Sequence, residues 1–160
     1  MRNYKRICYL AGPMESVKDA GRGWREVYSE ELKQLGFMCI IPEDKEEFIT
    51  NQEELNDLKK TDRHQYVDIM RKLISLDLKF VETADIIVTR WNGEVTAGTI
   101  GEAQHAYLEG KLIYLVTDKE FHEIPGWFGA CFTEIFDSLD CLLLYLSEEL
   151  YGESQNEKEK

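Results

Sequence analysis

Short apolar runs that lack polar alternation recur along this chain, and segments with helical periodicity separate them. Runs of this kind are typical of strands buried on both faces, as in a parallel sheet with helices on either side. Five strands are predicted, at Ile7–Ala11, Phe37–Ile41, Ala84–Thr89, Leu112–Val116 and Cys131–Phe136. Helices are predicted at Gly23–Leu35, Asp62–Val81, Thr99–Glu109 and Ser138–Leu150. Because crossovers between parallel strands are right-handed, we expect a doubly wound, flavodoxin- or Rossmann-like α/β fold whose five-stranded parallel sheet has the order 2-1-3-4-5.

The length of 160 residues suits one domain, which we expect over residues 1–150, followed by a polar acidic tail over residues 151–160. The acid-rich stretch 43–57 is expected to be an exposed loop that could include a short helix. Acidic residues outnumber basic ones by 31 to 19, so the surface should repel nucleic acids and anionic lipids. No apolar run approaches the roughly 20 residues of a membrane helix, and the first residues lack a signal-peptide core.

The cysteines and histidines indicate no metal or disulfide framework. The four cysteines are Cys8, Cys39, Cys131 and Cys141; none form a C-x-x-C pair, and three lie inside apolar runs. This usage is typical of buried, reduced thiols in a cytoplasmic protein. We therefore expect this protein to be cytoplasmic. The three histidines lack metal-ligand spacing, so the sequence predicts no metal and no cofactor.

The loop after the first strand is the first candidate site, because ligands of doubly wound sheets bind beyond the carboxyl ends of the strands, between strands 1 and 3. This loop contains Gly12, Pro13 and Met14 and leads to Arg22 and Arg25. Glycine lets the backbone approach a ligand closely, and a helix start with two arginines favours a phosphate or carboxylate. An ordinary strand-to-helix turn is the alternative interpretation.

The loop after the third strand is the second candidate site. It passes from Trp91 through Thr96 and Gly98 into a helix that carries Thr99 and Glu102. A purely structural account exists, in which Thr99 and Glu102 form a capping box at the helix start. In the functional account, Glu102 and the threonine hydroxyls meet a polar ligand at the carboxyl edge of the sheet, and Trp91 stacks on its ring.

Asp77 is an unusual residue for its place in the predicted helix Asp62–Val81. It follows Leu73 by four residues and precedes Phe80 by three, so it lies on or beside the apolar face. A carboxylate there needs a hydrogen-bond partner or a chemical task, because burying it otherwise costs free energy. Asp85, beside the third strand, is interpreted instead as a structural cap or pair.

Together these segments resemble the nucleoside 2-deoxyribosyltransferase family, which includes the deoxynucleoside 5′-monophosphate N-glycosidases and many small phage proteins. The resemblance covers about residues 7–116 and rests on Tyr9–Met14, Asp77, Ala84–Val88, Gly98–Ala103 and Gly110–Lys111. It implies an enzyme, a hydrolase or glycosyltransferase of nucleotide metabolism, that cleaves or transfers the N-glycosidic bond of a (2-deoxy)nucleoside or its 5′-monophosphate.

The resemblance also implies roles for three residues. The residue that matches Glu102 is the family's nucleophile, which forms a covalent glycosyl intermediate that water or a second base resolves. The residue that matches Asp77 holds the sugar or assists proton transfer at the leaving base. Tyr9 is the nearest match to a tyrosine that supports the nucleophile.

The sequence departs from the transferase pattern at Thr96, where transferases have an aspartate that contacts the base. Monophosphate hydrolases have a serine there that helps to bind the 5′-phosphate, and Thr96 offers the same hydroxyl. With Gly98, Thr99 and Arg22 or Arg25 nearby, this favours a monophosphate substrate. Glu94 is an alternative source of the missing carboxylate.

Two further expectations concern the alternatives to an active monomer. The alternative function is a catalytically inactive protein of the same fold that binds or senses a nucleotide, in which the capping box is only structural.

Family members often complete the site with a neighbouring subunit, so a homodimer or higher homo-oligomer is expected. The apolar residues Trp127, Phe128 and Phe132 could form its interface or pack within the monomer. The expected partner is a small nucleoside or nucleotide, with no nucleic acid polymer and no membrane.

Overall fold

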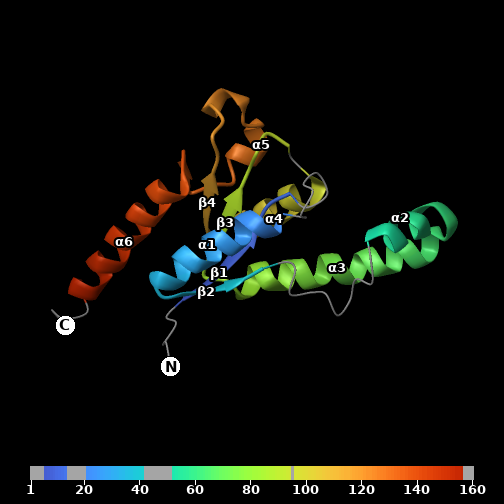
Figure 1. Cartoon of the computed structure of the whole chain (residues 1–160), viewed down its shortest axis with the longest axis horizontal. Helices are drawn as coiled ribbons and strands as arrows, with labels where there is room; N and C mark the ends of the chain where they lie inside the picture. The colour runs from blue at the N-terminus through green and yellow to red at the C-terminus, as the bar shows by residue number, and fades with distance from the viewer. Residues whose placement is uncertain (1–5, 14–20, 42–51, 95, 157–160) are drawn as a thin grey trace.

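The fold is a five-stranded parallel sheet with helices on both sides (Figure 1). The computed structural model describes residues 6–13, 21–41, 52–94 and 96–156. Its elements are β1 (Arg6–Ala11), α1 (Arg22–Gln34), β2 (Phe37–Ile40), α2 (Gln52–Thr61), α3 (Arg63–Thr83), β3 (Ile86–Arg90), α4 (Ala97–Leu108), β4 (Leu112–Val116), the 3-10 turn η2 (Phe121–Glu123), α5 (Gly126–Gly129), β5 (Glu134–Phe136) and α6 (Leu139–Asn156). The strand order β2-β1-β3-β4-β5 and the parallel pairing of all neighbours confirm the predicted fold class.

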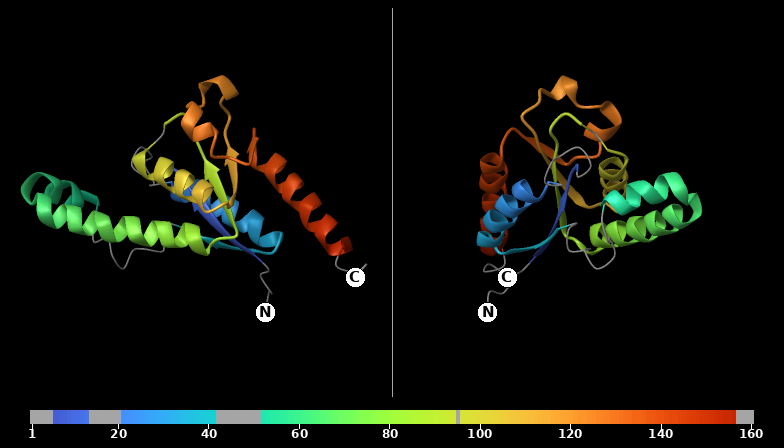
Figure 2. Two further views of the ribbon diagram at one scale, coloured as in Figure 1. Left: turned by 180° about the vertical axis from the view of Figure 1, so that it is seen from behind. Right: turned by 45° about the vertical axis from the view of Figure 1, so that its right-hand side comes forward.

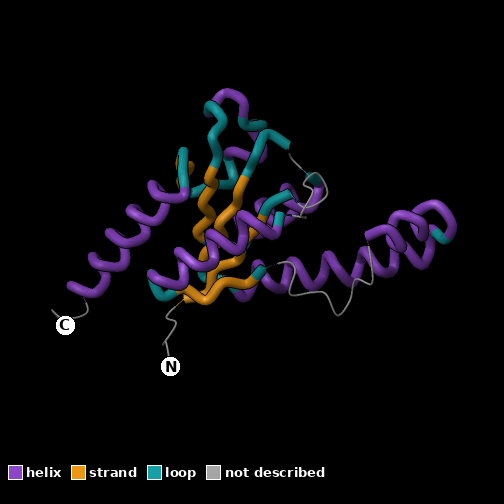
Figure 3. Tube along the Cα trace, viewed as in Figure 1, coloured by secondary structure: helices purple, strands orange, loops and turns teal. Residues whose placement is uncertain are grey.

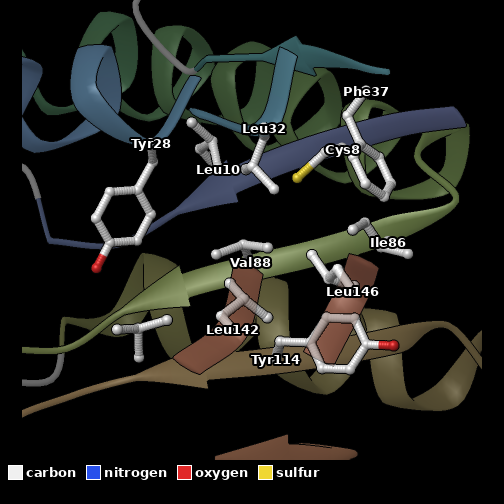
Figure 4. Close-up of a cluster of buried hydrophobic side chains, with 11 residues drawn as sticks. Cys8, Leu10, Tyr28, Leu32, Phe37, Ile86, Val88, Tyr114, Leu142 and Leu146 are labelled. Carbon is white, nitrogen blue, oxygen red and sulfur yellow. The ribbon is translucent and has the colours of Figure 1, made fainter. Parts of the chain in front are cut away.

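The strands lie in one layer between the helices, as the tube in Figure 3 and the views in Figure 2 show. Because successive side chains of a strand point to opposite faces, each central strand contributes to two cores. In β1, Cys8 and Leu10 pack with α1 and α6, while Tyr9 and Ala11 pack with α3 and α4. Figure 4 shows the first of these cores, where Leu32 of α1 and Leu142 of α6 meet the sheet.

Helix α3 is longer than the sheet that it covers. Its 21 residues span about 31 Å, whereas strands of five or six residues span about 17–20 Å. Its first half therefore projects from the sheet together with α2, which packs on it (Figures 1 and 2). The short helix expected in the acidic stretch 43–57 corresponds in part to α2, and residues 42–51 lie outside the described residues.

Several element boundaries follow local signals in the sequence. Gly36 and Gly110 end α1 and α4 with φ of +91° and +67°, which is the left-handed conformation that glycine adopts most readily. Ser138 begins α6 as predicted, since its Oγ accepts a hydrogen bond from the Cys141 backbone N–H at 3.3 Å. Cys141 itself is exposed, so the expectation of a buried thiol is wrong at this position.

The last strand and the last helix differ in length from the prediction. The strand expected over Cys131–Phe136 is shorter, because β5 covers only Glu134–Phe136. Helix α6 continues to Asn156, beyond the expected end at Leu150. Among the helices of the described residues, none is long and apolar enough to cross a membrane.

Candidate active site

A buried hydrogen bond joins Tyr9 of β1 to Glu102 of α4. The Tyr9 hydroxyl donates to Glu102 Oε1 at 2.7 Å, although the two residues are 93 positions apart in the sequence. The Tyr9 side chain is fully buried and Glu102 is 9% exposed. A distance of 2.7 Å is that of a well-formed O–H···O hydrogen bond and lies at the upper end of the range for a hydroxyl that donates to a carboxylate.

Helix α4 begins two residues before its predicted start, and this changes the interpretation of Glu102. Thr96 is the N-cap, and its Oγ1 accepts a hydrogen bond from the Thr99 backbone N–H at 3.4 Å. The Thr96 and Thr99 hydroxyl oxygens are themselves 2.9 Å apart. In a capping box the acid lies three residues after the N-cap, whereas Glu102 lies six residues after Thr96. The predicted Thr99–Glu102 capping box is therefore wrong, and Glu102 is placed in the second turn of α4, bonded to Tyr9.

The turn after β1 brings the backbone close to the end of β3. A Cβ atom on Gly12 would lie 2.8 Å from the Trp24 ring and 2.9 Å from the Arg90 carbonyl oxygen. Glycine is thus the residue that fits between β1, the first turn of α1 and the end of β3. Pro13 is buried beside it, while Met14 lies outside the described residues.

The two arginines of α1 lie in different environments. Arg25 is fully buried, and its guanidinium donates to the carbonyl oxygens of Leu10 at 3.3 Å and Gly12 at 2.9 Å. It also lies over the Trp24 ring, 4.6 Å from the centroid. These contacts hold the turn after β1 in place. Arg22 is exposed at the first position of α1 and is therefore the more accessible of the two cations.

Asp77 lies on the face of α3 that meets β1. The Phe80 ring, one turn further along, packs against the Tyr9 ring with centroids 6.2 Å apart. Leu73 and Val81, four residues before and after Asp77, are both buried. Because residues three and four apart share a helix face, the partly buried Asp77 belongs to the stripe that faces Tyr9.

The end of β3 contains two buried polar groups on the α4 side of the sheet. Trp91 is 3% exposed, and its ring packs edge-on against Phe128 at 6.2 Å, in a core that includes Ala103. Thr89 is fully buried. Within the described part of the chain, neither the Thr89 hydroxyl nor the Trp91 indole N–H has a hydrogen-bond partner. Thr89 is not among the residues predicted from the sequence, although a polar residue near the carboxyl end of an apolar strand is a signal for this part of the sheet.

The apolar cluster expected near residue 130 is mostly buried within the chain. Phe128 is 2% exposed and packs edge-on against Phe132, with ring centroids 4.8 Å apart. Trp127 is 84% exposed. Packing within the monomer therefore accounts for the two phenylalanines, and a homo-oligomer stays a prediction.

The residues at the amino-terminal ends of the central strands make structural contacts. The Asp85 carboxylate accepts a hydrogen bond from the Ile7 backbone N–H at 2.6 Å, in agreement with its structural interpretation. Lys111 Nζ donates to the carbonyl oxygens of Glu82 at 2.6 Å and Ala84 at 2.9 Å, which fastens the end of α3 to the start of β4. Among the residues described, no three histidine, cysteine or acidic side chains are grouped to hold a metal ion.

These features define a doubly wound α/β protein in which a buried tyrosine of β1 is bonded to a carboxyl group in the second turn of the helix after β3. No family model and no curated protein matches the sequence. Among solved structures, a 2-deoxyribosyltransferase from Bacillus psychrosaccharolyticus is similar, with a TM-score of 0.63 and 17% identity over 86% of this chain and 90% of that one. A CMP N-glycosidase from Clostridium botulinum is similar with a TM-score of 0.53 and 17% identity, over 91% of this chain and 99% of that one. At 17% identity the likeness establishes the fold. The predicted resemblance to nucleoside 2-deoxyribosyltransferases is therefore confirmed for the fold.

Proposed function

We propose that this protein is an enzyme that cleaves the N-glycosidic bond of a 2-deoxynucleoside or its 5′-monophosphate, with Glu102 as the nucleophile. The observation that carries the proposal is the buried hydrogen bond between Tyr9 and Glu102 in the second turn of α4. The capping box that offered a purely structural reason for Glu102 is absent, because Thr96 caps the helix. The two similar structures, whose names describe a deoxyribosyltransferase and an N-glycosidase, support the same chemistry.

In the proposed mechanism, a Glu102 carboxylate oxygen attacks the anomeric carbon of the sugar and the base leaves. The hydroxyl of Tyr9 holds Oε1 at 2.7 Å and so fixes the orientation of the carboxylate before attack. Water or a second base then attacks the same carbon and releases Glu102, which gives overall retention. Asp77 is proposed to hold the sugar or to assist protonation of the leaving base. Whether water or a base is the acceptor decides between hydrolase and transferase.

A 5′-monophosphate is the proposed substrate because of the groups at the start of α4. The first N–H groups of a helix lack intrahelical acceptors and favour an anion. Thr96 Oγ1 accepts the hydrogen bond of the Thr99 N–H. The N–H groups of residues 97 and 98 therefore remain as candidate donors to the phosphate, and the exposed Gly98 lets the phosphate approach the backbone closely. Arg22 is proposed to add a positive charge, while Arg25 holds the turn after β1.

The decisive experiment measures base release by Glu102→Gln. The amide oxygen can still accept from Tyr9, so the variant should lose only about 1 kcal/mol of unfolding free energy. Base release, followed by chromatography over a panel of deoxynucleosides and their 5′-monophosphates, should fall at least about a thousandfold. Glu109→Gln is the matched control, because Glu109 is exposed at the end of the same helix.

Two results would overturn the proposal. Near-normal base release by Glu102→Gln would remove Glu102 from the nucleophile role. A wild-type protein that releases no base from the panel, yet melts at higher temperature with a nucleotide, would be a binding protein instead. The monophosphate preference is tested separately: Arg22→Gln should raise the KM for a 5′-monophosphate about tenfold and leave that for the nucleoside unchanged, whereas Arg71→Gln on α3 should change neither.

A further inference from the structure

Two cysteines lie directly opposite each other on neighbouring strands, on the face of the sheet away from Tyr9. Cys8 of β1 and Cys39 of β2 are partners in the parallel register. Both side chains belong to the core formed with α1 and α6, in which Figure 4 shows Cys8 near Leu32 and Phe37. The two cysteines therefore lie on the other face of the sheet from Tyr9 of the proposed active site.

The spacing of the two residues suits a disulfide bond. Neighbouring strands are about 4.8 Å apart, and disulfides join Cα atoms that are about 4.4–6.8 Å apart. As register partners on parallel strands, the two side chains leave the sheet on the same face. In the reduced protein the Cys8 thiol donates weakly to the Tyr9 carbonyl oxygen at 3.9 Å and the Cys39 thiol to that of Ser29 at 4.0 Å. Because β2 is the edge strand of the sheet and is only four residues long, it can move the short distance that an S–S bond requires.

The environments of the two thiols differ, and this assigns them different roles. Cys8 is fully buried, and burial is the main cause that raises its pKa well above the usual value. Cys39 is only partly buried, and its pKa is lowered, chiefly by the neighbouring Cys8 and further by Ser29 and Lys33, against the opposing effect of burial. Because the thiolate is the reactive form, Cys39 is the thiol that meets an oxidant first.

We propose that Cys8 and Cys39 are a redox modification site that hydrogen peroxide converts to an intramolecular disulfide and that a dithiol reductant restores. The Cys39 thiolate attacks one peroxide oxygen, the O–O bond breaks, and Cys39 becomes a sulfenic acid as hydroxide leaves. The sulfur of Cys8 then attacks the sulfur of Cys39, the S–O bond breaks, and the departing hydroxide takes the Cys8 proton to form water. Each sulfur loses one electron, and the peroxide is reduced to one hydroxide and one water.

The disulfide would connect the edge strand to the centre of the sheet. It would close the chain segment between Cys8 and Cys39, which includes all of α1. Closing such a segment restricts the unfolded chain, so the oxidised protein should unfold at a higher denaturant concentration than the reduced protein. Dithiothreitol should reverse the shift.

The test is a thiol count and a peptide map after peroxide treatment of the whole chain. We use a Cys141→Ser background, because Cys141 is exposed and would otherwise react on its own. Titration of the unfolded protein should show the loss of two of its three remaining thiols, and a non-reducing map should show the Cys8 peptide joined to the Cys39 peptide. Cys131→Ser should leave the new bond unchanged, whereas Cys39→Ser and Cys8→Ala should each abolish it.

The proposal is overturned if the map shows Cys39 as a sulfinic or sulfonic acid while Cys8 stays reduced, or if Cys39 links two chains. It is also overturned if both thiols remain reduced at a peroxide concentration that oxidises Cys141 in the wild-type protein. The wild-type map decides the question even where a variant fails to fold.

Discussion

The hydrogen bond between Tyr9 and Glu102 can be measured by a double-mutant cycle that does not depend on the function. A hydrogen bond to a charged group contributes about 1.5–3 kcal/mol, and a neutral one about 0.5–1.5 kcal/mol. An ionised Glu102, which the proposed mechanism requires, places this bond in the first class, and the 2.7 Å distance is compatible with it. Tyr9→Phe should therefore cost about 1.5–3 kcal/mol of unfolding free energy in the wild type, and less in a Glu102→Gln background, where the bond is neutral. The difference predicts a coupling energy of about 1–2 kcal/mol.

The assay is equilibrium unfolding in urea of the wild type, both single variants and the double variant. The slope of the unfolding free energy against urea concentration should be the same for all four proteins, so that differences between their midpoints report differences in stability. A matched control cycle pairs Glu102→Gln with Tyr107→Phe, because Tyr107 is on the same helix but 60% exposed. The control coupling should be close to zero. A Tyr9–Glu102 coupling below about 0.3 kcal/mol would refute the reasoning, since effects that small are within the additivity of independent sites.

Three further predictions concern stability. Thr96→Val should cost about 1 kcal/mol in urea unfolding because it removes the N-cap oxygen of α4, whereas Thr96→Ser should not; equal stability of both variants would contradict this cap assignment. Gly12→Ala should cost about 1–3 kcal/mol, because its Cβ would lie 2.9 Å from the Arg90 carbonyl oxygen. Gly101→Ala, inside α4 with open space around it, is the control and should gain about 0.5–1 kcal/mol. Burial raises the pKa of Tyr114 from 10 to about 12, so stability present below pH 10 should be lost as the pH rises toward 12. Because solvent screens part of this shift, that loss should reach about 1–2 kcal/mol and should be smaller in Tyr114→Phe; an identical pH profile would exclude Tyr114 as its source.

The sheet was predictable from the sequence because its signals are local. Apolar runs mark the strands, helical periodicity marks the crossovers, and the handedness of crossovers leaves few orders for five parallel strands. The predicted start of a helix was wrong where two nearby residues could serve equally well as its N-cap. Thr96 and Thr99 can each cap a helix, and the sequence does not say which one does. The structure selects Thr96, with the hydroxyl of the buried Thr99 beside it.

The candidate site was predictable only in part, and mainly through the family resemblance. Glu102, Tyr9 and Asp77 were selected as motif residues, but no local pattern shows that the Tyr9 hydroxyl reaches Glu102 across 93 positions. Arg25 and Arg22 look alike in the sequence, yet one is buried against main-chain carbonyl oxygens and the other is exposed. Local sequence does not report burial of a long polar side chain, because that depends on which carbonyl groups the fold brings within its reach.

The sequence by itself determined the fold class, the strand order and the acidic surface, since periodicity and charge are properties of consecutive residues. Only the tertiary structure shows the hydrogen bond between Tyr9 and Glu102, whose association the family resemblance had implied without geometry, and the pairing of Cys8 with Cys39. The first pairing depends on the rotation of α4 against the sheet, and the second on the register of β1 against β2. Those quantities are set by packing of the whole core, where a shift of one residue would turn every side chain of a strand to the other face.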